Sequence, residues 1–205
     1  MAADVGSKAP DFALVNGERE TVKLKDAIGS ENVVLAFFPG AFSGTCTKEM
    51  CAFRDAMSQL KGLNAKVFGI STDTFFTLKA WGDQQKLGFP LLSDYNKEAI
   101  QAYGVVNPDM IGLKNIAKRA VFVLDKGGTI RYREVLEDAR NEPDYDKLKQ
   151  ALAQVARLQI RSWKLVAEKK WPALSTAPSV RSTPSRSSRS MAWTAATKWR
   201  FSSAG

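Results

Sequence analysis

The sequence contains no histidine and only two cysteines, and these shortages exclude several kinds of site. Without histidine there is no Ser-His-Asp triad, no Cys-His pair and no HExxH zinc site. Two cysteines cannot supply the ligands of a structural zinc site, and they allow one disulfide at most. Any nucleophilic chemistry must therefore be activated by something other than imidazole.

Long apolar runs are also missing. No stretch approaches the ~20 apolar residues that a membrane span needs. Residues 1–6 lack the basic start and the apolar segment that are typical of a secretory signal. We therefore expect a cytoplasmic protein without membrane contact, in a compartment where free thiols are normally reduced.

Positive charge is concentrated at the C-terminal end. Residues 1–160 hold 21 Lys and Arg against 20 Asp and Glu, whereas residues 161–205 hold nine basic residues and one acid, Glu168. We predict a folded domain over residues 4–160 and a basic tail over residues 161–205. The Ser, Pro and Arg content of the tail favours disorder. Its arginines and tryptophans could instead contact nucleic acid, and we favour disorder over that alternative.

Strand-like and helix-like segments alternate before the tail. Residues 32–38 form a continuous apolar run that Pro39 and Gly40 close, as expected for a strand buried on both faces. Further strands are expected at residues 66–71, 89–92, 119–124 and 129–134, and helices at 43–60, 74–86, 97–103 and 145–158. The last two strands flank a Gly-containing turn and predict a hairpin. This order predicts an α/β fold with a mixed central sheet flanked by helices.

Cys46 follows the first buried strand and stands near the start of the helix expected at residues 43–60. At such a junction the free backbone N–H groups and the positive helix end favour an anion. A thiolate is an anion, so this position offers a histidine-free route to a nucleophilic sulfur. The alternative is a small buried hydrophobic residue, the ordinary role of an intracellular cysteine.

The residues around Cys46 form a motif of fixed spacing. Pro39 stands seven positions before the cysteine, Ser43 three before it and Glu49 three after it. This pattern resembles the Pro-x-x-x-Thr/Ser-x-x-Cys motif of the peroxiredoxins, of the bacterioferritin-comigratory-protein or alkyl hydroperoxide reductase E type. The resemblance covers residues 4–155, with further matches at residues 9–12, 69–73, 89–94 and 119–125. It implies a thioredoxin-like fold.

The resemblance also implies a thiol-dependent peroxidase acting on hydrogen peroxide or organic hydroperoxides. Cys46 would attack the peroxide, and Ser43 would hydrogen-bond the sulfur or the peroxide oxygen. Arg119 would hold the thiolate and stabilise the departing oxygen, and Pro39 would shield the pocket from water. Read alone, Ser43 is a helix N-cap, Arg119 a solvated charge and Pro39 the end of a strand. Thioredoxin or a similar dithiol protein would supply electrons, no metal or organic cofactor is implied, and a homodimer is common in the family.

Cys51 stands five residues after Cys46, the spacing of the resolving cysteine in the bacterioferritin-comigratory-protein branch. On an intact helix the two residues lie ~140° apart around the axis and ~7.5 Å apart along it, too far for a disulfide. We therefore expect residues 43–54 to unwind if Cys51 resolves the oxidised Cys46. Two alternatives stay open: resolution by an external thiol, or a thioredoxin-like disulfide reductase. Such reductases use Cys-x-x-Cys, which this chain lacks.

Overall fold

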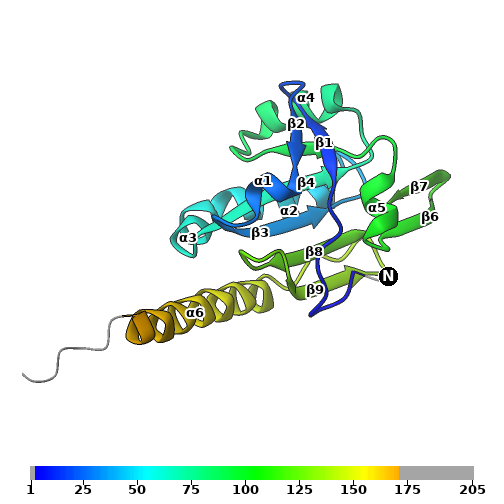
Figure 1. Cartoon of the computed structure of the whole chain (residues 1–205). Helices are drawn as coiled ribbons and strands as arrows, with labels where there is room; N and C mark the ends of the chain where they lie inside the picture. Colours follow the sequence, from blue (N-terminus) through cyan, green and yellow to red (C-terminus); the bar gives the residue numbers. More distant parts are fainter. Residues whose placement is uncertain (1–2, 171–205) are drawn as a thin grey trace, which may run out of the picture.

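A seven-stranded mixed sheet forms the centre of the computed structural model, which describes residues 3–170 (Figure 1). The strands lie in the order β2-β1-β5-β4-β3-β8-β9. Their bounds are Ala13–Asn16 for β1, Thr21–Lys23 for β2, Asn32–Phe37 for β3, Ala65–Ser71 for β4, Leu91–Ser93 for β5, Arg119–Leu124 for β8 and Ile130–Leu136 for β9. Strands β3, β4 and β5 are parallel, whereas β8 runs antiparallel to β3 and to β9. The predicted mixed sheet and the β8–β9 hairpin are confirmed.

Helices cover both faces of the sheet. Their bounds are Leu24–Ala27 for α1, Gly44–Asp55 for α2, Met57–Gly62 for α3, Phe75–Gln85 for α4, Glu98–Ala102 for α5 and Tyr145–Lys170 for α6. Helices α2, α3, α4 and α6 pack on one face and α1 and α5 on the other. Strand β3 is buried along its whole length, because alternate side chains enter the two cores. Its continuous apolar sequence follows from this position.

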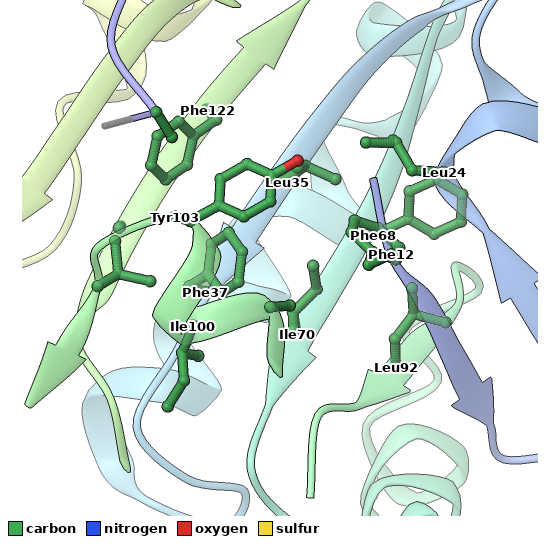
Figure 2. Packing of buried hydrophobic residues seen from close by; sticks show 14 of the residues in the cluster. Phe12, Leu24, Leu35, Phe37, Phe68, Ile70, Leu92, Ile100, Tyr103 and Phe122 are labelled. Carbon is green, nitrogen blue, oxygen red and sulfur yellow. The ribbon is translucent and has the colours of Figure 1, made fainter. Parts of the chain in front are cut away.

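Aromatic rings fill the core under α5. Figure 2 shows the rings of Phe37, Tyr103 and Phe122 packed together. Their centroids lie 5.1 to 5.8 Å apart. The Tyr103 hydroxyl donates a hydrogen bond to the carbonyl oxygen of Pro10 at 2.8 Å. The N-terminal segment is therefore tied to the same core that supports the end of β3.

The single helix expected at residues 43–60 is wrong, because two helices meet at Ala56. The backbone of Ala56 has φ −85° and ψ −3°, outside the regular helical values. The apolar stripe nevertheless continues across the break, with Met50, Phe53 and Leu60 all buried. Hydrophobic periodicity therefore could not reveal the break.

A second sheet contains only β6, Val106–Met110, and β7, Leu113–Ala117. This antiparallel hairpin projects from the main sheet (Figure 1). Its tip carries Ile111, which is 98% exposed. The sequence did not predict these strands, since half of their residues are exposed and β6 contains Pro108.

Helix α6 continues to Lys170 and crosses the boundary predicted between residues 160 and 161. The remainder of the predicted tail, residues 171–205, lies outside the described residues. Within residues 3–170, no helix combines the length and apolar character that crossing a bilayer requires.

Candidate active site

Cys46 lies in the first turn of α2. Ser43 is the N-cap of this helix, and its Oγ accepts a hydrogen bond from the Cys46 backbone N–H at 3.4 Å. The Thr47 hydroxyl donates to the Ser43 carbonyl oxygen at 2.8 Å and reinforces the same turn. The side chain of Cys46 is buried. The sulfur therefore occupies the helix start that the sequence predicted, and it faces inward.

Arg119 reaches Cys46 from the adjacent strand. It begins β8, and the next residue, Ala120, pairs with Phe37 at the end of β3. Because β8 is antiparallel to β3, its first residue lies where the chain leaves β3 towards α2. Nη2 of Arg119 donates to Sγ of Cys46 at 3.4 Å. Arg119 is 1% exposed, so the solvated-charge interpretation is wrong.

The guanidinium group of Arg119 has two further partners. Nη1 forms an ion pair with Oε2 of Glu49, and the Ala139 carbonyl oxygen accepts from Nη2 at 2.8 Å and from Nε at 3.3 Å. Burial acts to lower the pKa of Arg119, but Glu49 and Cys46 outweigh it and the net shift is upward. The arginine therefore stays charged and is held in one orientation beside the sulfur.

The sequence analysis noted the spacing of Glu49 from Cys46 but predicted no role for it. It is fully buried, and burial raises its pKa to about 7 although the neighbouring Arg119 acts to lower it. Its Oε1 has no hydrogen-bond partner among the described residues. The signal was its spacing: a residue three positions after Cys46 lies on the same side of a helix.

Pro39 is buried in the loop that follows β3. The loop that follows β3 is fixed by Asp73, whose Oδ2 accepts from the Ala41 N–H at 2.7 Å and from the Ser71 hydroxyl at 2.9 Å. Pro39 and Ser43 line a cavity of about 540 Å³. Of the predicted site residues, Ser43, Cys46 and Arg119 are joined by hydrogen bonds, while Pro39 and Ser43 face the adjacent cavity.

Cys51 lies further along α2, half-buried and without a disulfide. Its Sγ is 3.8 Å from Oε1 of Gln85 at the end of α4. Nη1 of Arg54 donates to the Gln85 carbonyl oxygen at 2.8 Å. The helix is intact between the two cysteines, so their bonding requires α2 to change shape. In the described part of the chain, no three His, Cys, Asp or Glu residues are grouped so as to hold a metal ion.

The model of the AhpC/TSA family matches residues 5–133. The chain belongs to this family. It is 38% identical over 134 residues to alkyl hydroperoxide reductase E of Mycobacterium tuberculosis, a match that covers 64% of this chain and 85% of that protein. The crystal structure of peroxidoxin BcpB from the same organism has a TM-score of 0.67 at 28% identity, covering 73% of this chain and 96% of that chain.

Plant relatives show a similar level of likeness. The chloroplastic 2-Cys peroxiredoxin BAS1 of Hordeum vulgare is 36% identical over 141 residues, which cover 64% of this chain and 65% of that protein. The match to the Spinacia oleracea protein of the same name covers 52% of that protein. The match thus spans between half and two thirds of these relatives. The peroxiredoxin resemblance and the thioredoxin-like fold are confirmed, while the cytoplasmic location stays a prediction.

Proposed function

We propose that the chain is a thiol-dependent peroxidase with Cys46 as its nucleophile. The contact between Nη2 of Arg119 and Sγ of Cys46 carries this proposal. A guanidinium group fixed beside a sulfur at a helix start stabilises a thiolate without histidine. The family of the chain, and relatives named peroxiredoxin and alkyl hydroperoxide reductase, support the same reaction.

The first step oxidises Cys46 to a sulfenic acid. The thiolate attacks the outer oxygen of the hydroperoxide, an S–O bond forms and the O–O bond breaks. The departing oxygen leaves with the electron pair and takes up a proton, giving water or an alcohol. Arg119 is placed to stabilise the charge on that oxygen, because its N–H groups are oriented before the reaction begins. Ser43 would assist from the N-cap position, and the buried ring of Pro39 would exclude water.

The second step returns the sulfur to the thiol state. Cys51 is the proposed resolving residue: its thiolate attacks the sulfur of the sulfenic acid, the S–O bond breaks as the disulfide forms, and the departing hydroxide takes up a proton to give water. A dithiol protein such as thioredoxin would then reduce the disulfide by exchange. Because Cys46 and Cys51 occupy one intact helix, this route requires α2 to unwind. An external thiol that reacts directly with the sulfenic acid is the alternative.

Intact mass after one equivalent of hydrogen peroxide tests both roles. We expect a loss of about 2 Da in the wild type and a gain of about 16 Da in Cys51→Ser. Cys46→Ser should remain unchanged and should leave the peroxide unconsumed. Peroxide consumption by Cys46→Ser would refute the peroxidase proposal. A gain of about 16 Da in the wild type would instead exclude Cys51 as the resolving residue.

A further inference from the structure

The loop between β3 and α2 determines where Cys46 lies, because it carries the chain from the sheet to the helix start. At the sheet end, the N–H of Phe38 donates to the Ile70 carbonyl oxygen of β4 at 3.0 Å. At the helix end, Ser43 is the N-cap and accepts from the Cys46 N–H. The conformation of residues 39–42 therefore sets the position of the first turn of α2.

Phe42, directly before the N-cap, has a left-handed backbone with a φ of 65°. This conformation is unfavourable for a bulky residue, because its Cβ crowds the neighbouring carbonyl group. The ring is 54% exposed, and its centroid lies 6.3 Å from that of Trp81, so packing restrains it weakly. A strained backbone persists only where the surrounding structure fixes it. A contact beside Phe42 must therefore hold the turn.

The carboxylate of Asp73 holds the residue that precedes Phe42. Its Oδ2 accepts from the Ala41 N–H at 2.7 Å. Asp73 is itself anchored to two strands of the sheet. The hydroxyl of Ser71 at the end of β4 donates to the same Oδ2 at 2.9 Å, and the hydroxyl of Ser93 at the end of β5 donates to the Asp73 carbonyl oxygen at 2.6 Å. Because hydrogen bonds to a carboxylate are strong, the sheet fixes the loop through this one side chain.

We propose that Asp73 is a positioning residue for Cys46 and acts through the loop rather than on the sulfur. Its carboxylate keeps the left-handed turn at Phe42 in place. That turn puts Ser43 at the N-cap and Cys46 within reach of Arg119. Without the carboxylate the turn relaxes, and the sulfur is away from the guanidinium group for part of the time. This inference rests on the proposed function, because it assigns a positioning residue to the same site.

Two measurements on Asp73→Ala test the inference, both in a Cys51→Ser background that leaves one thiol. The first is the second-order rate of Cys46 oxidation by hydrogen peroxide, which should fall about tenfold, since a hydrogen bond to a charged group is lost. The second is the fraction of Cys46 that is ionised at neutral pH, read from the ultraviolet absorbance of the thiolate, which should decrease. Asp73→Ser repeats the test if the Ala variant does not fold, because it also removes the carboxylate.

Charge and positioning predict opposite results for the thiolate. Loss of a nearby negative charge alone would increase the ionised fraction of Cys46. Asp73→Asn loses the same charge but keeps an oxygen that can accept from Ala41, so it should retain most of the oxidation rate and not lower the ionised fraction. A larger ionised fraction in both the Ala and the Asn variants would reduce the effect to charge and overturn the inference.

Asp125→Ala is the matched control. Asp125 is also half-buried and accepts from two backbone N–H groups, those of Gly127 and Thr129, each at 2.9 Å. It follows the end of β8 that lies opposite Arg119, so its loss should change neither measurement. Equal slowing by Asp125→Ala would show a general loss of stability and contradict the positioning role. Wild-type rate and ionisation in Asp73→Ala would do the same.

A double-mutant cycle tests the strain at Phe42. Glycine adopts the left-handed backbone without a steric cost, so the turn depends less on Asp73 in a Phe42→Gly background. Asp73→Ala should slow the reaction only about threefold there. Equal slowing in both backgrounds would show that the carboxylate does not hold the strained turn. Failure of the parent protein to consume hydrogen peroxide would instead refute the proposed function, whereas the thiolate measurement would still report on Asp73.

Discussion

Nη2 of Arg119 lies 3.4 Å from Sγ of Cys46, although the two residues are 73 positions apart in the chain. The antiparallel register of β3 and β8 produces this contact, because Phe37 at the end of β3 pairs with Ala120. The arginine is further held by Glu49 and by the Ala139 carbonyl group. The sulfur therefore meets an oriented donor that is in place before a substrate arrives.

Replacing Arg119 with Met should lower the second-order rate of the reaction with hydrogen peroxide at least about 100-fold, because a preorganised donor is removed. It should also cost about 3–5 kcal/mol of the free energy of unfolding, since buried Glu49 loses its partner. Stopped-flow kinetics and urea unfolding measure the two effects. Arg119→Lys keeps the charge but not the fork of donors, and should recover only part of each loss.

Stability should depend on pH through Glu49. Its pKa of about 7 in the folded protein lies above the ordinary 4.5, so the folded state binds this proton more tightly than the unfolded chain. The stability contributed by this group is complete below pH 4.5 and is lost as the pH rises through 7. Urea unfolding at several pH values should therefore show a decline in the wild type over this window that Glu49→Gln lacks. If the free energy of unfolding changed with pH in the same way in the wild type and in Glu49→Gln, Glu49 would not be the group that causes the decline.

Ser43→Ala should reduce the free energy of unfolding by about 1 kcal/mol, because α2 loses the side-chain oxygen that accepts from the Cys46 N–H. Ser43→Thr keeps an N-cap oxygen and should change stability little. Thermal or urea unfolding of the reduced proteins distinguishes them. Equal free energies of unfolding for Ser43→Ala and Ser43→Thr would show that the cap formed by the Ser43 hydroxyl contributes nothing to stability.

Arg54→Met should speed formation of the Cys46–Cys51 disulfide. Arg54 ties the last turn of α2 to the Gln85 carbonyl group of α4, and this bond must break if α2 unwinds. At a high peroxide concentration, we expect the ratio of disulfide to over-oxidised Cys46 to rise about fivefold, as measured by intact mass. Asp55→Asn removes the other partner of Arg54 and leaves the Gln85 bond, so it serves as the control. An unchanged product ratio in Arg54→Met would refute this role.

Local sequence was enough to predict β3 and the start of α2, although not the end of α2 before Ala56. Strand β3 is apolar along its whole length because both faces are buried, and α2 follows a Ser that caps it. The Arg119 contact was predicted only through the resemblance of residues 119–125 to the peroxiredoxin family. Strand pairing brings distant residues together, and a single sequence does not encode it visibly.

Other partners carried no sequence signal. The Ala139 oxygen that holds Arg119 is a backbone group, which any residue could supply. The β6–β7 hairpin was missed because half of the residues in its strands are exposed and the strands lack an apolar pattern. As a result, the cavity wall that contains Leu113 was invisible before the fold was known. Glu49 was visible by spacing, but its burial was not.

The break at Ala56 limits how far the proposed unwinding of α2 extends along the chain. If α2 unwinds from Ser43, only the hydrogen bonds of α2 need to break, because α3 starts a separate helix at Met57. Leu60 of α3 is buried in the core and would hold α3 in place during such a movement. The hinge of this proposed movement would then lie at Ala56, the C-terminal end of the twelve-residue α2, and the rest of the domain would keep its fold.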